Sequence, residues 1–326
     1  MKITFYFRSN RKGVFSIEVL FSRLMVSLGH RVTARCRQVG LLSMLNELLT
    51  RLIRPSDIYH ITGDVNYIAL SLKGSKTILT IHDIGHYTNT LNGWKKIVYK
   101  KLWFDWPLYK VAAITVVSEF SKQQLMTVFS IEASKIKVIH NPFPVSYKKS
   151  DKRVLSDRPK IMQIGSGAHK NLSRLLEAVK DIPCELMLVR AYDNSLDEQL
   201  KQQGVVATWF FNLSDKAMYE VYEACDLVFF ASTYEGFGMP ILEAQAIGRA
   251  VITSKIASMP EVAGEGALLV DPYRSDEIRE AIMKLLHDDV YRNNCIEKGF
   301  NNLNRFHPDF IAQEYLNLYT QLSAKR

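Results

Sequence analysis

The sequence predicts an α/β protein made of two doubly wound domains, each with a parallel β-sheet covered by helices. Three observations support this fold class. Short apolar runs alternate with amphipathic windows along the whole chain. The 326 residues are more than one ordinary hydrophobic core organises. A proline-containing segment followed by a polar one interrupts the alternation near the middle of the chain.

Each short apolar run that is bounded by turn residues is an expected strand, because buried parallel strands are continuously apolar. Helices are expected between the strands, for example at 172–179, 217–224 and 278–286, and again at 306–326. The expected strands are Ile3–Phe7, Ile58–Ile61, Thr77–Ile81, Ile114–Val117, Lys137–Ile139, Lys160–Ile164, Leu186–Val189, Val206–Phe210, Leu227–Phe230, Ala250–Thr253 and Ala267–Val270.

A domain boundary is expected after Asn141-Pro142-Phe143-Pro144, where prolines break regular structure and a charged stretch from Lys148 to Pro159 follows. The predicted division is therefore a first domain at 1–150, a second domain at 151–305 and a last helix at 306–326.

The composition is that of a globular protein, with 47% hydrophobic and 23% charged residues. No apolar run approaches the length of a membrane-spanning helix, and the first residues are too short and too soon charged for a signal peptide. The four cysteines are scattered, without the spacing of a zinc site or a disulfide framework. These features lead us to expect a cytoplasmic protein.

The charge is divided unevenly between the two halves. Residues 1–150 hold 22 Lys and Arg against 8 Asp and Glu, a net charge of +14, while the remainder holds 20 against 25, or −5. The first domain is therefore expected to face an anionic partner. The charge alone fits a phospholipid surface, a nucleic acid or a phosphate-bearing substrate.

The strongest chemical pattern is the segment 234–243, Tyr-Glu-Gly-Phe-Gly-Met-Pro-Ile-Leu-Glu, which follows an apolar strand. Its two glycines let the backbone approach a ligand, and Pro240 suits the first position of a new helix whose free N–H groups attract anions. Glu235 and Glu243 can each accept paired hydrogen bonds from vicinal hydroxyls. The alternative is an ordinary strand–turn–helix connection with Glu235 in solvent and Glu243 on a polar helix face.

With seven residues between its two acids, this segment resembles the hallmark of retaining glycosyltransferases of the GT-B fold, and especially of their large fourth sequence family. The resemblance implies two Rossmann-like domains whose parallel sheets face across a cleft, with helix 306–326 returning to the first domain. It implies that Glu235 contacts the transferred sugar and Glu243 the ribose of a nucleotide-diphosphate sugar. The remaining implied donor contacts of this segment are Gly236, Phe237, Gly238 and Met239.

A second matching segment, 162–172, places glycines between a strand and a helix and carries Lys170, which is suited to neutralising a phosphate. The resemblance implies that Lys170 binds the donor diphosphate beside Gly165 and Ser166. The family often has arginine where Ser166 stands, so the phosphate is held mainly by Lys170 or also by another cation. Taken alone, Lys170 would be interpreted as a solvated residue at a helix start.

The third segment, Thr80-Ile81-His82-Asp83, ends a strand of the first domain. The resemblance places His82 opposite the donor, where a histidine can donate to a sugar hydroxyl or to charge developing on the leaving phosphate. Asp83 is a weaker candidate as general base for the acceptor. Gly13 falls where the family commonly has two glycines near the acceptor. Arg190 stands where many relatives have glycine, which alters the pocket near the nucleotide base.

The sequence contains no Asp-x-Asp, the pattern with which glycosyltransferases of the other major fold hold a divalent cation. We therefore expect no cofactor and a metal-independent transfer, with Lys170 and helix N-termini supplying the positive charge.

The segment 94–107 holds three of the four tryptophans, interleaved with four lysines. In a helix, Tyr99, Trp103 and Trp106 would share one face, and basic-aromatic helices lie on anionic membranes. The alternative is a core-packing helix with a solvated lysine face. The expected membrane contacts are Trp94, Lys95, Lys96, Lys100, Lys101, Trp103 and Trp106. Nucleic acid is not expected as a partner, because no binding module accompanies the charge.

These features predict a retaining, metal-independent transfer of a hexose or N-acetylhexosamine from a UDP- or GDP-sugar to a lipid-linked glycan. The enzyme would act peripherally on the inner face of the cell membrane. Two alternatives remain, a nucleotide-sugar epimerase on the same scaffold and a nucleotide-sugar-binding protein without catalysis. A nicotinamide dehydrogenase fits less well, because no Gly-x-Gly-x-x-Gly follows the first strand.

Overall fold

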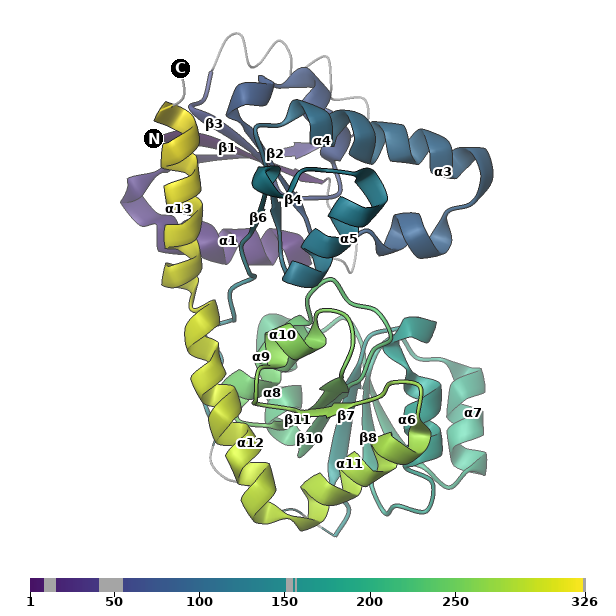
Figure 1. Ribbon diagram of the computed structural model, residues 1–326. Helices are drawn as coiled ribbons and strands as arrows, with labels where there is room; N and C mark the ends of the chain where they lie inside the picture. The colour runs from purple at the N-terminus through teal and green to yellow at the C-terminus, as the bar shows by residue number, and fades with distance from the viewer. Residues whose placement is uncertain (9–15, 41–54, 151–154, 156, 325–326) are drawn as a thin grey trace. The chain divides into compact units, whose positions relative to one another are not determined.

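The computed structural model describes residues 1–8, 16–40, 55–150, 155 and 157–324. The chain forms two compact units (Figure 1). Unit 1 comprises Met1–Pro142 and Phe306–Arg326, and unit 2 comprises Phe143–Arg305. The predicted boundary after residue 150 is therefore too late, because the chain already joins the second unit at Phe143, inside the Asn-Pro-Phe-Pro segment.

Unit 1 contains a six-stranded parallel sheet with the strand order β2-β1-β3-β4-β5-β6. The strands are β1 (Lys2–Arg8), β2 (Thr33–Val39), β3 (Ile58–Ile61), β4 (Thr77–Ile81), β5 (Ala113–Val116) and β6 (Ile136–Val138). The α-helices are α1 (Ser16–Leu28), α3 (Gly93–Tyr99), α4 (Trp106–Lys110), α5 (Glu119–Phe129) and α13 (Pro308–Ala324). Short 3₁₀ turns lie at Gly29–Arg31, Asn66–Ser71, Gly74–Lys76 and Ala133–Lys135, and π-helical turns at His86–Thr90 and Lys100–Asp105. A further 3₁₀ turn, Leu303–Phe306, begins in unit 2 and ends at the first residue of the returning part of unit 1.

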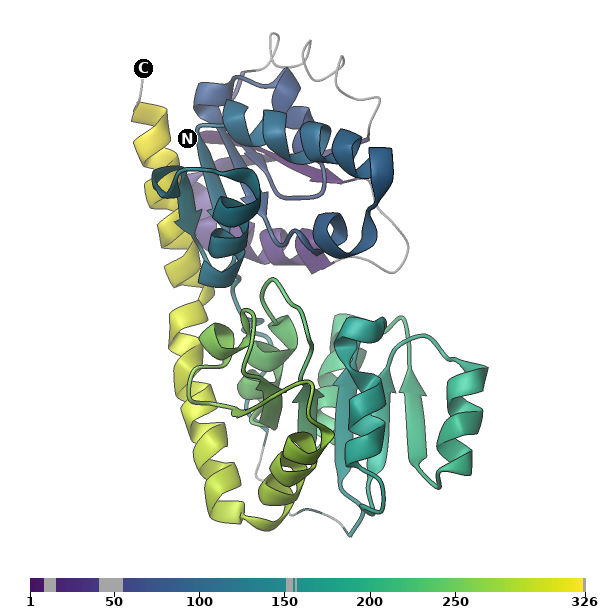
Figure 2. The ribbon, with the colours of Figure 1, turned by 45° about the vertical axis from the view of Figure 1, so that its right-hand side comes forward.

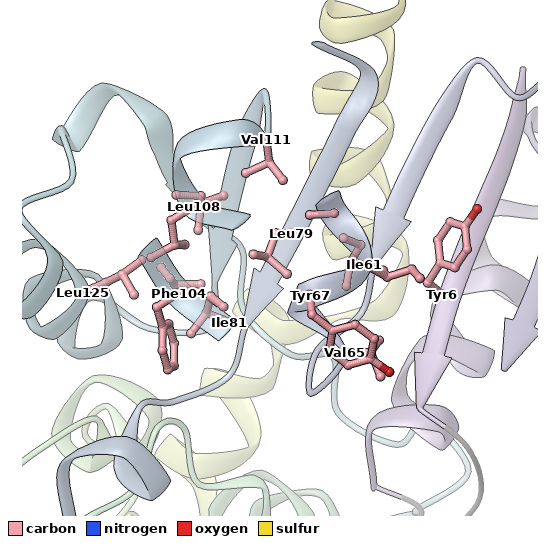
Figure 3. Close-up of a cluster of buried hydrophobic side chains, with 14 of the residues drawn as sticks. Tyr6, Ile61, Val65, Tyr67, Leu79, Ile81, Phe104, Leu108, Val111 and Leu125 are labelled. Carbon is pink, nitrogen blue, oxygen red and sulfur yellow. The ribbon is translucent and has the colours of Figure 1, made fainter. Parts of the chain in front are cut away.

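Alternation along the strands gives unit 1 two apolar layers, because successive side chains of a strand point to opposite faces of a sheet. One layer joins Tyr6, Ile61 and Leu79 of the strands to Phe104 and Leu108 of the helical segment around α4 (Figure 3). All five are almost completely buried. Burial of this kind contributes roughly 1.5–3 kcal/mol per large apolar side chain, so this face fixes the sheet against its helices.

The other face of the sheet binds the C-terminal helix α13 through a buried polar network. The Nδ1 atom of His60, on β3, lies 2.7 Å from the hydroxyl of Tyr319, on α13. Its Nε2 atom lies 2.7 Å from the hydroxyl of Thr80, which in turn lies 2.7 Å from that of Thr115. The ring of Phe5 packs edge-on against Tyr319. Residues more than 250 positions apart are thereby joined in one core.

Unit 2, drawn from teal to yellow-green in Figure 2, contains a second parallel sheet. This sheet has six strands in the order β12-β11-β10-β7-β8-β9. Its strands are β7 (Lys160–Ile164), β8 (Glu185–Val189), β9 (Val206–Phe210), β10 (Leu227–Phe230), β11 (Ala250–Ser254) and β12 (Leu268–Val270). Its helices are the 3₁₀ turn Ala168–Lys170, α6 (Leu172–Ala178), α7 (Asn194–Gln202), α8 (Asp215–Ala224), α9 (Met239–Ile247), α10 (Met259–Ala263), α11 (Ser275–His287) and α12 (Asp289–Asn302).

Helices cover both faces of the second sheet. On one face, Leu175 of α6 and Ile282 of α11 pack with Leu186, Phe229 and Ile252 of the strands. On the opposite side, α9 contacts β10, β11 and the neighbouring helix α8 (Figure 1). This arrangement buries the sheet in the manner of parallel α/β proteins.

The doubly wound α/β class is confirmed, and every predicted strand overlaps an observed one. The strand that the sequence did not reveal is β2, Thr-Ala-Arg-Cys-Arg-Gln-Val, at the edge of the first sheet. Its polar residues conceal the strand, because an edge strand keeps much of its surface in water and needs no continuous apolar run.

We predict that His60 makes the stability of the protein depend on acid. Burial lowers the pKa of His60 from 6.5 to about 3. Between these two pH values the His60 ring is therefore protonated in the unfolded chain and neutral in the folded chain. Stability from this group is present above pH 6.5 and is lost as the pH falls, by about 1.4 kcal/mol per pH unit. The free energy of unfolding, measured by urea titration, should fall between pH 7 and pH 5 by about 2 kcal/mol more in the wild type than in His60→Gln.

The matched control is His30→Gln, because His30 is exposed and its removal should leave the acid profile of the wild type unchanged. Parallel stability curves for wild type and His60→Gln between pH 7 and pH 5 would contradict the prediction.

Candidate active site

The carboxyl ends of β7 and β10 mark the topological switch point of the second sheet. From β7 the chain adds β8 and β9 on one side, and β10, β11 and β12 extend the sheet on the other. The loops that follow β7 and β10 therefore leave in different directions, and ligands of open α/β sheets bind between such loops. Lys170 follows β7 and Glu235 follows β10, so both strongest sequence segments meet at this point.

Lys170 and Glu235 form an ion pair across the switch point. The Nζ atom of Lys170 lies 2.5 Å from Oε1 of Glu235, and the two side chains are only 18% and 16% exposed. The ammonium also lies 5.0 Å from the centre of the Phe230 ring, at the end of β10. A charged pair of this burial is well ordered, and each partner holds the other in a defined position.

The glycine turn after β7 makes room for Lys170. Gly165 has a φ of +95°, and a Cβ atom added to it would lie 2.8 Å from Cε of Lys170. Any other residue at 165 would therefore strain the backbone and displace the lysine stem. Ser166 is exposed on the same turn.

The loop from Glu235 to Met239 is fixed by hydrogen bonds from Ser258, a buried residue that could not be identified from the sequence. The hydroxyl oxygen of Ser258 lies 2.9 Å from the carbonyl oxygen of Glu235 and 2.6 Å from that of Phe237. Its single proton is shared between the two carbonyl oxygens. Phe237 is itself buried. Helix α9 begins at Met239, so Pro240 occupies its second position, one later than expected.

Glu243 lies one turn inside α9, where its Oε2 atom accepts a hydrogen bond of 2.7 Å from the hydroxyl of Tyr222. Tyr222 belongs to α8 and is fully buried. Burial, together with the nearby Glu243 carboxylate, raises the pKa of Tyr222 well above its usual range, so the hydroxyl remains a donor. Glu243 is thus oriented by α8, a contact between distant positions that the linear pattern did not reveal.

Asn171 also joins the loops of this edge. Its backbone is left-handed, with a φ of 60°, and its side chain is completely buried. The Nδ2 atom donates to the carbonyl oxygens of Ala231 and Pro272, at 2.9 Å and 2.7 Å. The only advance signal was its place directly after Lys170, since asparagine tolerates left-handed backbone better than most residues.

His82 and Asp83 lie in unit 1, after β4. The Nε2 atom of His82 donates to the carbonyl oxygen of Thr62 at 2.8 Å. Desolvation lowers the pKa of His82, which favours the neutral ring. A neutral ring whose Nε2 already donates has only an acceptor left at Nδ1. The role predicted for His82 toward a donor stays a prediction, and in this structure Nδ1 is the ring nitrogen that does not contact the Thr62 carbonyl. Asp83 is exposed, and its Oδ1 accepts from the backbone N–H of Gly85 at 2.7 Å.

A charged cluster lies at the switch point of the first sheet, between the ends of β1 and β3. The Arg8 guanidinium contacts Glu18 at 3.0 Å and Asp64 at 2.6 Å. This cluster was not predicted, because its members are far apart in the sequence. Gly13, the other residue expected near the acceptor, lies outside the described residues.

The basic-aromatic segment forms α3, the π-helical turn Lys100–Asp105 and α4. Trp94 and Trp106 are 70% and 53% exposed, but Trp103 stacks on Tyr99 with ring centres 4.8 Å apart. Tyr99 and Trp103 pack against the core of unit 1. The expectation that Tyr99, Trp103 and Trp106 present one face to a membrane is therefore wrong, because the first two anchor the segment.

The lysines of this segment also fall into two groups, those that contact other side chains of the protein and those that are exposed. Lys96 lies over the Tyr87 ring at 4.9 Å, and Lys100 lies 3.4 Å from the Asp105 carboxylate. Lys95 and Lys101 are exposed. The exposed part of the segment consists of Trp94, Lys95, Ile97, Val98, Lys101, Trp106 and Tyr109, and is called the basic-aromatic surface below.

In residues 1–8, 16–40, 55–150, 155 and 157–324, no helix combines the length and the apolar character that crossing a membrane requires. In the same residues, no three or more His, Cys, Asp or Glu side chains gather in a group that could hold a metal ion.

The fold and this site define an α/β protein that has its acid–lysine centre at a strand switch point, and comparison with known proteins identifies its family. Residues 147–302 match the family model described as glycosyl transferases group 1, and residues 23–147 match that of glycosyltransferase family 4. The chain belongs to these glycosyltransferases, which have the GT-B fold.

Individual proteins agree with this assignment. The O-antigen chain mannosyltransferase B of Escherichia coli is 26% identical over 287 residues, which are 81% of this chain and 74% of that protein. The sucrose-phosphate synthase of Thermosynechococcus elongatus superposes with a TM-score of 0.81, at 16% identity and over 100% of both chains. Anabaena Alr3699/HepE, solved in complex with UDP-glucose, gives a TM-score of 0.78 at 17% identity, over 98% of this chain and 100% of that one.

We predict that Ser258→Ala loosens the loop that carries Glu235. Removing the hydroxyl leaves two buried carbonyl oxygens without their donor, which costs about 1–3 kcal/mol of stability. The melting temperature should fall by a few degrees, and the KM for the donor should rise, since the loop is no longer fixed.

Thr320→Ala is the matched control, because the Thr320 hydroxyl is exposed on α13 and bonds only within its own helix, to the Leu316 carbonyl. If Ser258→Ala behaves like this control in both melting temperature and donor KM, the hydrogen bonds of the Ser258 hydroxyl have no role in the site.

Proposed function

We propose that this glycosyltransferase moves a hexose or N-acetylhexosamine from a nucleotide-diphosphate sugar to a lipid-linked glycan during cell-surface polysaccharide synthesis. The observation that carries the proposal is the Lys170–Glu235 pair at the switch point of the second sheet. It joins a cation suited to phosphate with a carboxylate suited to sugar hydroxyls, at the edge where doubly wound sheets bind their ligands.

Each residue of the site has a defined task in this reaction. The Lys170 ammonium exchanges Glu235 for the diphosphate and stabilises the charge that develops when the bond between sugar and phosphate breaks. Glu235, released from Lys170, accepts hydrogen bonds from hydroxyls of the transferred sugar, and Glu243 from those of the ribose. Gly165, Gly236 and Gly238 bring backbone close to the donor.

We further propose that the transfer retains the anomeric configuration and needs no metal ion. No carboxylate of the motifs is an evident nucleophile, so the leaving phosphate itself takes up the proton of the incoming hydroxyl. His82 contacts the substrate through a hydrogen bond at its ring and takes up no proton, and Asp83 is the alternative base that would take the acceptor proton in place of the leaving phosphate.

The acceptor and the location follow from similarity and from the basic-aromatic surface. The relative with 26% identity is an O-antigen chain mannosyltransferase, which supports a polysaccharide acceptor and makes mannose a donor sugar to test first. Exposed tryptophans beside exposed lysines favour an anionic lipid surface. We therefore propose peripheral attachment to the inner face of the cell membrane, where a lipid-linked acceptor is presented.

Two alternatives make different predictions. A nucleotide-sugar epimerase would convert the donor without any acceptor, and a binding protein without catalysis would leave the donor intact. The membership in a glycosyltransferase family favours neither.

Glu235→Gln is predicted to lower the rate of sugar transfer about 100-fold or more, because it removes the charge that positions both Lys170 and the sugar. The measurement is transfer from GDP-mannose, and in parallel from UDP-glucose and UDP-N-acetylglucosamine, to a membrane extract that contains lipid-linked glycans. Proton NMR of the product gives its anomeric configuration, and excess chelator tests the need for metal.

Glu220→Gln is the matched control, since Glu220 is an exposed acid on α8 of the same unit. Transfer by Glu235→Gln at the wild-type rate would refute the role of Glu235, and donor conversion without acceptor would refute the proposed reaction. Inversion of the product, or a loss of activity in chelator that manganese restores, would refute the corresponding part of the mechanism.

The basic-aromatic surface is predicted to bind anionic vesicles. Each lysine near such a surface contributes about 1 kcal/mol, so Lys95→Gln/Lys101→Gln should weaken binding to phosphatidylglycerol-containing vesicles roughly 30-fold. Sedimentation with vesicles measures the effect, and Trp94→Ala/Trp106→Ala tests the aromatic part. The control, Lys73→Gln/Lys148→Gln, removes the same charge from other exposed positions. An equal loss in the control would mean that only net charge matters.

A further inference from the structure

Three polar side-chain atoms of unit 2 are buried without a hydrogen-bond partner among the described residues. They are Oε1 of Gln163, Nε of Arg190 and Oγ of Ser232. Gln163 lies near the end of β7, Arg190 directly follows β8, and Ser232 follows β10. These are three neighbouring strands, and all three residues lie at their carboxyl ends, beside Lys170 and Glu235.

The register of the strands places Arg190 beside the glycine turn. Ile164 of β7 pairs with Val189 of β8, and the backbone N–H of Gly165 donates to the carbonyl oxygen of Val189 at 3.0 Å. Arg190 follows Val189 directly, and its backbone N–H donates to the carbonyl oxygen of Leu188 at 3.2 Å, so the chain bends at Arg190, directly after the residue that receives the hydrogen bond from Gly165. Ser166 has a small uncharged side chain, which leaves room there for a guanidinium.

The charges at this edge make Arg190 important for an anionic ligand. Lys170 already shares its charge with Glu235, so the pair together presents no net charge. In the part of the chain that the structure describes, Arg190 forms no ion pair. A guanidinium never loses its proton at physiological pH, and its planar N–H groups match phosphate oxygens two at a time.

We propose that Arg190 is a second diphosphate-binding residue, which supplies from β8 the positive charge that Lys170 alone does not provide. This inference rests on the proposed function, because it assumes a nucleotide-diphosphate donor at the switch point. Arg190 contacts phosphate rather than the nucleotide base. Beside the neutral Lys170–Glu235 pair, Arg190 gives this edge of the sheet a net positive charge of one.

The test is calorimetric binding of UDP and GDP to the full-length protein, with uridine and guanosine as probes that lack phosphate. Arg190→Gln should weaken the binding of whichever of UDP and GDP binds more tightly by about 10- to 100-fold, as expected when one charge-assisted, bidentate hydrogen-bonding contact is lost. Binding of the matching nucleoside should change less than twofold. Ser166→Arg added to Arg190→Gln should restore most of the lost affinity, since it places a guanidinium on the neighbouring glycine turn after β7.

The matched control is Lys216→Gln, which removes a positive charge from an exposed position of α8 and should leave diphosphate affinity unchanged. An equal loss for nucleoside and diphosphate in Arg190→Gln, at unchanged melting temperature, would overturn the inference in favour of a contact to the base. Unchanged diphosphate affinity would overturn it outright. If the wild type binds neither UDP nor GDP, the proposed function itself fails, which is a separate result.

Discussion

The ion pair between Lys170 and Glu235 is the interaction on which the site of this glycosyltransferase depends. It joins the loops after β7 and β10, the two strands from which the second sheet grows in opposite directions. The glycine turn at 165, the Ser258 hydroxyl and the Asn171 amide all serve to hold these two loops in place. Because the pair is only slightly exposed, bulk water screens the attraction between its two charges less than it would at the surface.

The first sheet also has charged side chains in contact at its strand switch point, but they are different residues. Arg8, Glu18 and Asp64 form a charged cluster where the winding direction reverses, and His82 follows the neighbouring strand with its Nε2 already bonded to backbone. On the face of this sheet that binds α13, His60 joins the C-terminal helix to the strands through Tyr319. The end of the chain is thus part of the core of the first unit.

The sequence predicted those parts of the molecule whose cause is local. Continuous apolar runs revealed the buried strands. The Glu235–Glu243 and Gly165–Lys170 segments indicated the candidate site, because each combines glycines, a helix start and a charged residue within a short stretch of chain. Ser258, Tyr222 and the partner of Lys170 could not be predicted, because they reach the site through strand order. The polar edge strand β2 was missed since it lacks an apolar run, and the inward packing of Trp103 depends on the π-helical turn at Lys100–Asp105.

The most direct test of the donor site is a crystal structure of the protein soaked with a nucleotide-diphosphate sugar that supports transfer. We predict that the diphosphate lies between the carboxyl ends of β7 and β10, that Lys170 Nζ has moved from Glu235 to a phosphate oxygen, and that Glu235 contacts the sugar. A bound donor elsewhere, with the Lys170–Glu235 pair intact, would contradict the assignment of this site.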